Sequence, residues 1–166
     1  MSKQGQTGES GPSQPKDGAE NATPAPFSIA LESRGNTIQL LPAGRFAATD
    51  GSGRPKGLDG WFIDAEIAAE LIEKIEQRNL RLPIDYEHQS FLVEKNGQPA
   101  PAAGWFRTVE WREGEGLFAV DVEWTDKARE MIQSGEYRYL SPVFTWNPET
   151  GDVTSLIGAG ITNNPG

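Results

Sequence analysis

The chain has 166 residues, with 15 Lys and Arg against 24 Asp and Glu, so its formal net charge is −9. This length predicts one domain, or one domain with a tail, and the acidic balance disfavours a nucleic-acid partner because phosphate backbones are also negative. The absence of cysteine excludes a disulfide scaffold, a thiolate nucleophile and Cys-ligated metal sites. No stretch has the length of a membrane span or the pattern of a signal peptide, so we expect a cytosolic protein without a membrane partner.

The N-terminal segment differs in composition from the rest of the chain. Residues 1–26 are rich in glycine, proline and small polar residues, and no aromatic residue precedes Phe27. Such a segment buries too little apolar surface to offset the entropy lost on ordering. We therefore expect a disordered tail over 1–26, either a solvated terminus or a tether, and one folded domain over 27–166.

The first half of the folded domain combines short strands with one clear helix. Apolar and β-branched runs predict strands at 27–31 and 37–41, joined by a turn at 33–36, and a glycine-rich loop follows at 49–57. Ile63, Ile67, Leu71 and Ile75 then recur every four residues, which indicates an amphipathic helix of about four turns. Asp64 is its expected N-cap.

The second half is richer in strands. We expect strands at 82–87, 104–111 and 117–124, the last two paired as a hairpin across 112–116, then a short helix from Thr125 to Gly135. Two further strands, 137–146 and 153–162, flank a turn at 147–151. Together these elements predict a β-rich α+β fold in which a mostly antiparallel sheet curls into a barrel with helices packed outside it.

His88 is the one histidine of the chain, and it follows Asp85 and Glu87 at the end of a predicted strand. Imidazole titrates near neutrality, which suits acid and base catalysis, although a hydrogen-bonded structural role is the alternative. Asp85, Glu87 and His88 converge poorly as metal ligands because neighbours in a strand point to opposite faces, so no metal is expected. Alternatively, one of the two carboxylates orients His88 as the third member of a nucleophilic triad.

Ser141 lies in a second candidate segment, directly before Pro142. Strand alternation places it in a row with Tyr139 and Val143. Proline removes an amide hydrogen, so we expect an interrupted ladder, typical of a sheet edge or of a place where a substrate strand approaches. The alternative is a half-buried strand serine with no role in chemistry.

Pro142 also bears on how an oxyanion would be stabilised. The nucleophile elbow of α/β-hydrolases uses the amide of the residue after the serine, which proline lacks, so that fold is excluded. Hydrogen-bond donors to the oxyanion must then come from another segment. The candidate run is Gly158, Ala159 and Gly160, because glycine lets a backbone approach a substrate closely. The same glycines could instead serve only a tight corner of the barrel.

The order of the motifs resembles a known family. From about Gln39 to Pro165 the chain carries, in sequence, Leu41-Pro42-Ala43-Gly44, Asp85-Tyr86-Glu87-His88, Ala103-Gly104-Trp105, Glu136-Tyr137-Arg138-Tyr139-Leu140-Ser141-Pro142 and Ile161-Thr162-Asn163-Asn164-Pro165. This combination is similar to the head-maturation proteases of Mu-like phages and prophages, where the region is the protease portion of a protease/scaffold protein. That family is similar in turn to the prohead proteases of other tailed phages and to herpesvirus assemblins, which are serine proteases built on a helix-flanked β-barrel.

The resemblance implies that residues 27–166 form a serine protease domain, with Ser141 as nucleophile and His88 as general base. It implies an endopeptidase that needs no cofactor and cleaves scaffold and major capsid proteins, and also itself, inside the assembling prohead in the bacterial host cytoplasm. A homodimer follows by analogy with the assemblins. The scaffold portion does not follow Gly166, so we expect a truncated or processed protease domain.

Two departures from the pattern leave the third member of the site open. Assemblins use a second histidine, which this chain lacks, and related phage proteases place a glutamate where this chain has Leu156-Ile157-Gly158. Asp85, Glu87, or a Ser–His dyad assisted by a backbone carbonyl or water are the alternatives. A non-catalytic scaffold or capsid-assembly module of the same fold, and a metal-dependent hydrolase, are the competing functions.

Overall fold

The computed structural model describes residues 23–24, 29–31 and 35–164. The expected tail over 1–26 lies outside these residues except for Thr23 and Pro24, which form a two-residue strand. Of the expected strand at 27–31, residues 29 and 30 are described as a strand.

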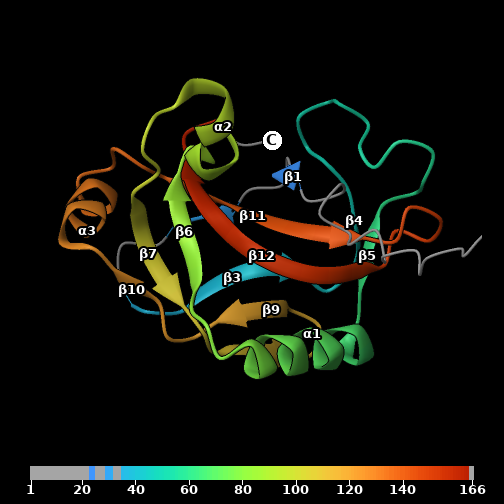
Figure 1. Ribbon diagram of the computed structural model, residues 1–166. Coiled ribbons are helices and arrows are strands. Elements are labelled where there is room, and N and C mark those ends of the chain that lie inside the picture. Colours follow the sequence, from blue (N-terminus) through green and yellow to red (C-terminus); the bar gives the residue numbers. More distant parts are fainter. Residues whose placement is uncertain (1–22, 25–28, 32–34, 165–166) are drawn as a thin grey trace, which may run out of the picture.

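The largest sheet contains the segments that carry Ser141 and His88. Its strand order is β1-β11-β12-β6-β7-β10, and β2 also pairs with β11. Every pair is antiparallel except β12 with β6, which is parallel. In Figure 1, β12 runs as a long arc across the molecule, and the sheet curls with it. The strands are β1 (Thr23–Pro24), β2 (Ile29–Ala30), β6 (Leu82–Tyr86), β7 (Ala102–Phe106), β10 (Glu123–Trp124), β11 (Tyr139–Trp146) and β12 (Val153–Thr162).

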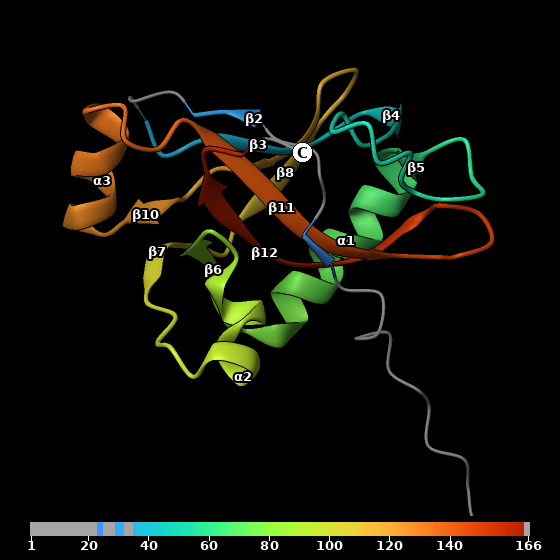
Figure 2. The ribbon, with the colours of Figure 1, turned by 90° about the horizontal axis from the view of Figure 1, so that it is seen from above.

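Two smaller sheets and the helices complete the described part of the chain. The sheets are formed by β3 (Ile38–Pro42), β9 (Gly116–Ala119) and β8 (Val109–Arg112), and by β4 (Gly44–Phe46) and β5 (Trp61–Ile63). The α-helices are α1 (Ala65–Arg78), α2 (Val93–Asn96) and α3 (Asp126–Gln133), and a short 3₁₀ helix covers Gln89–Phe91. Figures 1 and 2 show α1 and α3 at the outside of the sheets. The expected β-rich, mostly antiparallel α+β class is confirmed, and none of the described helices is long and apolar enough to cross a bilayer.

The helix α1 begins two residues later than its apolar pattern suggested. Ile63 belongs to β5, and the helix starts at Ala65. Asp64 is the N-cap, as expected, and its Oδ1 accepts a hydrogen bond from the Ile67 amide at 2.9 Å. A capping carboxylate satisfies one of the amides that the first turn of a helix leaves unpaired, which is why the helix starts here.

The expected hairpin of two long strands is wrong in one respect, because each strand breaks and changes sheet. Residues 102–106 and 123–124 belong to the large sheet, whereas 109–112 and 116–119 pair with each other in the sheet of β3. Asp121 explains the break: its Oδ1 accepts the amides of Arg107 at 3.0 Å and Thr108 at 2.9 Å. These amides leave the ladder, and both strands turn a corner there.

An aromatic cluster holds the C-terminal half of β11 against the core. Phe144 and Trp146 of β11 pack against Trp61 of β5 and Phe46 of β4. The Phe144 and Trp61 rings meet edge to face, with centroids 5.3 Å apart. Buried aromatic pairs of this geometry stabilise a core by about 0.5–1.5 kcal/mol beyond their area burial. The strand that carries Ser141 is thereby held to the rest of the core.

Candidate functional site

A tight turn at the end of β6 places His88. Glu87 and His88 both adopt the left-handed conformation, each with φ of 54°. This conformation costs roughly 1–2 kcal/mol for a residue with a Cβ, so neighbouring contacts must hold it. The Glu87 amide donates to the carbonyl of Ile161 in β12 at 2.9 Å, and the carbonyl of His88 accepts the Phe91 amide at 3.0 Å. The chain thus folds back over the sheet instead of continuing as a strand.

Asp85 is the group that holds this turn. Its Oδ1 accepts the His88 amide at 3.1 Å, and its Oδ2 accepts both the amide and the hydroxyl of Ser90, the amide at 3.0 Å. The Asp85 residue is 4% exposed. Hydrogen bonds to a buried carboxylate are stronger than neutral ones, so Asp85 fixes the backbone on which His88 sits. Sequence analysis missed Ser90, since nothing in the pattern shows that its side chain turns back to Asp85.

Ser141, Gly160 and Asp85 lie at the same level on three adjacent strands. Gly160 of β12 is the register partner of Ser141 in β11 and of Asp85 in β6. Side chains of directly paired residues point to the same face of a sheet, with Cβ atoms about 4.5–5.5 Å apart in an antiparallel pair. The strand pairing therefore aligns a hydroxyl and a carboxylate on either side of a glycine.

The His88 imidazole fills the space above that glycine. A Cβ on Gly160 would lie 2.8 Å from His88 Nδ1, 2.9 Å from His88 Cε1 and 2.7 Å from Asp85 Oδ1. The ring therefore lies over Gly160, on the face of the sheet toward which the paired residues Ser141 and Asp85 direct their side chains. Gly160 has a steric role here that sequence analysis missed, because it depends on the register of three strands far apart in the chain.

The His88 side chain is largely shielded from solvent and lies close to one carboxylate. The His88 side chain is 16% exposed, and its Nδ1 lies 4.0 Å from Asp85 Oδ1. That separation is too long for a hydrogen bond, and among the described residues the buried Nδ1 has no hydrogen-bond partner. Burial lowers the pKa of His88 below its ordinary 6.5, while the charges of Asp85 and Glu87 act in the opposite direction. The imidazole is therefore neutral at pH 7 and able to accept a proton.

Glu87 is held on the other side of the turn. The Thr162 hydroxyl donates to Glu87 Oε2 at 3.1 Å. Burial raises the pKa of Tyr137, as do the charge of Glu87 and a hydrogen bond to it. Of the two carboxylates that the sequence left open, Asp85 is the one whose oxygen faces the imidazole. Among the described residues, no group of three or more His, Asp and Glu side chains is placed to hold a metal ion.

Pro142 does not interrupt the pairing of β11 with β12, contrary to expectation. The two strands pair without a break from Tyr139 to Val143, and the register shifts only after Val143. On the far side of β12, Ala159 and Gly160 pair with β6. Ala159 and Gly160 thus belong to ladders on both sides, whereas Gly158 pairs with Val143 of β11, and the oxyanion role of Gly158, Ala159 and Gly160 stays a prediction.

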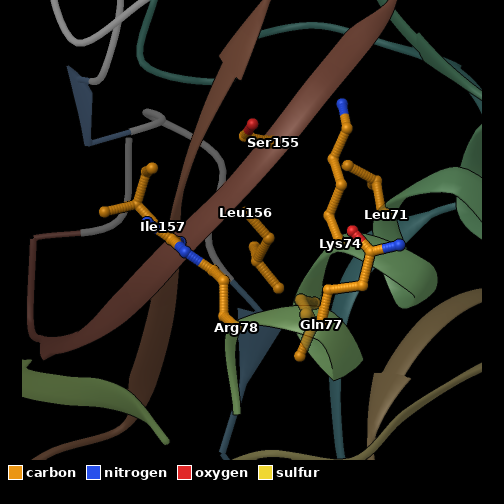
Figure 3. Close-up of a pocket in the computed structure, with 8 residues that line it drawn as sticks. Leu71, Lys74, Gln77, Arg78, Ser155, Leu156 and Ile157 are labelled. Carbon is orange, nitrogen blue, oxygen red and sulfur yellow. The ribbon is translucent and has the colours of Figure 1, made fainter. Parts of the chain in front are cut away.

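A separate cavity of about 400 Å³ lies between α1 and β12. Figure 3 shows Lys74 and Arg78 of α1 beside residues 155–157 of β12. Lys74 Nζ donates to the carbonyl of Thr154 at 2.8 Å. The lining of this cavity does not include Ser141, His88 or Asp85, so it is not part of the site described above.

Comparison with known proteins gives one family and two curated relatives. The family described as Mu-like prophage I protein, N-terminal domain, matches residues 38–166. Protease I of Escherichia phage Mu is 47% identical over 135 residues, which cover 77% of this chain and 37% of that protein. The Mu-like prophage FluMu I protein of Haemophilus influenzae is 40% identical over 156 residues, which cover 89% of this chain and 43% of that protein. The chain thus spans less than half the length of these relatives, and no solved structure matches it.

Proposed function

This chain belongs to the family of Mu-like prophage I proteins, N-terminal domain, and from that premise we propose that it is a serine endopeptidase of phage head maturation. Ser141 is the nucleophile, His88 the general base and Asp85 the group that orients the imidazole. The proposal is supported by the name Protease I of the phage Mu relative and by the alignment of these three residues. Its substrates are scaffold and major capsid proteins, cut inside the prohead in the host cell.

One observation carries the proposal: the imidazole stands over Gly160, between a buried carboxylate and the strand position of Ser141. In this arrangement His88 accepts the proton of the Ser141 hydroxyl as its oxygen attacks a peptide carbonyl, and then gives that proton to the leaving amine. Water then attacks the acyl-enzyme as His88 takes its proton, and His88 returns that proton to the Ser141 oxygen as the carboxylic acid product leaves. The 4.0 Å gap between Asp85 and Nδ1 closes to a hydrogen bond when the imidazolium forms, because such contacts tighten in the substrate complex.

The proposal extends to the fold and to assembly. By analogy with the assemblins and prohead proteases, the curled sheet with outer helices is proposed to be a variant of their barrel, and a homodimer is proposed by the same analogy. The developing oxyanion needs backbone donors, for which the run from Gly158 to Gly160 is the candidate. These points rest on the resemblance stated above, since an architecture alone does not determine an activity.

Labelling with a fluorophosphonate probe tests the reaction class. We expect the folded chain to be labelled covalently, to hydrolyse capsid or scaffold protein of its own phage, and to lose that hydrolysis once labelled. Excess chelator should change neither rate, whereas a metal-dependent hydrolase would stop. A non-catalytic assembly module would show neither labelling nor hydrolysis, and denatured chain serves as the control for non-specific reaction with surface hydroxyls.

Asp85→Asn and Glu87→Gln together identify the third member of the site. We expect Asp85→Asn to lower kcat by about 10²–10⁴, because the imidazolium loses the charge that faces it. It should also move the acid limb of the pH–rate profile to lower pH, since the Asp85 carboxylate raises the pKa of His88. Glu87→Gln, whose carboxylate is held by Thr162, should cost less than tenfold. The reverse order of effects would assign the role to Glu87.

The pH dependence of the reaction follows from the burial of His88. We expect kcat/KM to fall with falling pH along a limb centred below 6.5, because burial lowers the pKa of His88 and only the neutral ring accepts a proton. The free energy of unfolding should also decrease with falling pH. The unfolded chain binds this proton at higher pH than the folded chain, so acid favours unfolding as the pH falls through that range. A rate profile from about pH 5 to 8 checks the prediction, and a limb centred above the ordinary imidazole value would contradict it.

A further inference from the structure

The outer edge of β11 is paired with a segment of the same chain on both sides of Ser141. Thr23 and Pro24 of β1 pair antiparallel with Phe144 and Val143. The residues of β2, Ile29 and Ala30, pair antiparallel with Leu140 and Tyr139, and the Leu31 amide donates to the carbonyl of Arg138 at 2.7 Å. Figure 2 shows both short strands beside β11.

The register of these pairs brackets the proposed nucleophile. Between the partners of Pro24 and Ile29, β11 has two residues, Ser141 and Pro142. The opposite edge of β11 is already taken by β12, in which Gly160 pairs with Ser141. An extended peptide that reaches Ser141 by strand addition therefore has one edge of β11 available, and it is the edge with which β1 and β2 pair.

The pairing of this segment with β11 is short enough for another peptide strand to replace it. Each described stretch pairs over two residues, and Pro24 has no amide hydrogen to donate. A strand edge is a template for a further strand, and main-chain hydrogen bonds then supply affinity without demanding a particular sequence. A substrate peptide that pairs along this edge from Tyr139 to Phe144 can displace the two short described stretches.

We propose that the outer edge of β11 from Tyr139 to Phe144 is the peptide-binding edge of the proposed protease site, and that β1 and β2 of the same chain occupy it as an intramolecular competitor. The inference rests on the proposed function and adds to it the direction in which a substrate peptide runs along β11. A substrate bound with the same polarity places the residues before its scissile bond beside Val143 and Phe144. It places those after the bond beside Leu140 and Tyr139.

Occupation of the β11 edge by a segment of the same chain should weaken the binding of a separate substrate molecule. A tethered segment acts at an effective concentration of about millimolar, so weak pairing is enough to keep most of the edge filled. The apparent affinity for substrate falls by the fraction of molecules whose edge is open. Removal of the segment should therefore lower KM by about tenfold or more and leave kcat nearly unchanged.

The binding test uses a labelled synthetic peptide of residues 22–31 and two forms of the protein, the full chain and a chain that lacks residues 1–31. Fluorescence anisotropy should show saturable binding to the shortened chain and at least tenfold weaker binding to the full chain. A scrambled peptide of the same composition is the control, and thermal melting checks that the shortened chain is folded. A second shortened chain lacking residues 1–24, which keeps β2, should bind the peptide with intermediate affinity. Equal binding to all forms, or binding to none, would overturn the inference.

The kinetic test separates this inference from the proposed activity. In the shortened chain, the unlabelled peptide should raise KM for an extended substrate competitively, while the scrambled peptide has no effect. If anisotropy shows the expected binding but neither form reacts with a fluorophosphonate, then the proposed function fails and the edge assignment stands. If both forms react and hydrolyse substrate with the same KM, then the edge assignment fails and the proposed function stands.

Discussion

Replacement of Ser141 or His88 by alanine is expected to lower kcat by about 10⁴–10⁶, since either change removes the nucleophile or the base that activates it. The double variant should be no slower than the worse single variant, because the two groups act as one unit. Ser141→Ala should melt at nearly the temperature of the parent chain, since loss of one hydroxyl at a 4% exposed position changes the packing volume little. Rates with an extended peptide, together with thermal melts, check all three expectations.

Ser155→Ala is the matched control for that experiment. Ser155 lies on β12, pairs with Thr145 of β11 and lines the cavity beside α1, so it is a strand serine of the same sheet outside the proposed site. We expect its rate to stay within twofold of the parent, roughly the range expected for a side chain outside the chemistry. A Ser141→Ala chain that still cuts peptide at a tenth of the parent rate would remove Ser141 from the mechanism.

Gly160→Ala tests the geometry of the site without replacing a reacting group. The added Cβ would lie under 3.0 Å from Asp85 Oδ1 and from two atoms of the His88 ring, so the imidazole has to move. A displacement of about 1 Å at a catalytic group can cost 10²-fold in rate, and overpacking costs roughly 1–3 kcal/mol of unfolding free energy. We therefore expect kcat/KM to fall by about 10² or more, with a modest loss of stability.

Gly104→Ala separates displacement of His88 from general loss of stability. A Cβ at Gly104 of β7 would lie 2.9 Å from a ring carbon of Trp124 and 3.0 Å from the Glu123 carbonyl oxygen, a similar crowding in the same sheet. We expect a comparable fall in melting temperature with kcat/KM within a few-fold of the parent. Equal losses of activity in the two variants would show that the space above Gly160 has no particular part in the reaction.

The sequence predicts the regular elements well where the signal is local. Asp64, the predicted N-cap of α1, is observed as its cap, and the helix predicted to begin at Thr125 is observed with Thr125 as its N-cap. The strand 153–162 is observed with its expected bounds. By contrast, the break in the expected hairpin depends on where the Asp121 carboxylate binds, across a corner, and strand periodicity carries no information about that contact.

The sequence proposes the members of the candidate site but does not predict their arrangement. His88 and Ser141 stand out by residue type and by the family resemblance. Strand alternation, however, predicts that His88 points away from its neighbours, whereas two consecutive left-handed residues return it over the sheet. Two non-glycine residues in that conformation are too uncommon to expect from sequence. The approach of His88 to Gly160 then depends on register among three distant strands, which no local pattern encodes.

The most direct measurement of the central claim is the position of the fluorophosphonate adduct, mapped by peptide mass spectrometry on the folded chain. We expect a single adduct on Ser141, formed in the parent chain and absent after His88→Ala, because Ser141 is paired with Gly160, over which the His88 imidazole lies. An adduct on another residue, or hydrolysis that persists with Ser141 unmodified after full labelling, would contradict it.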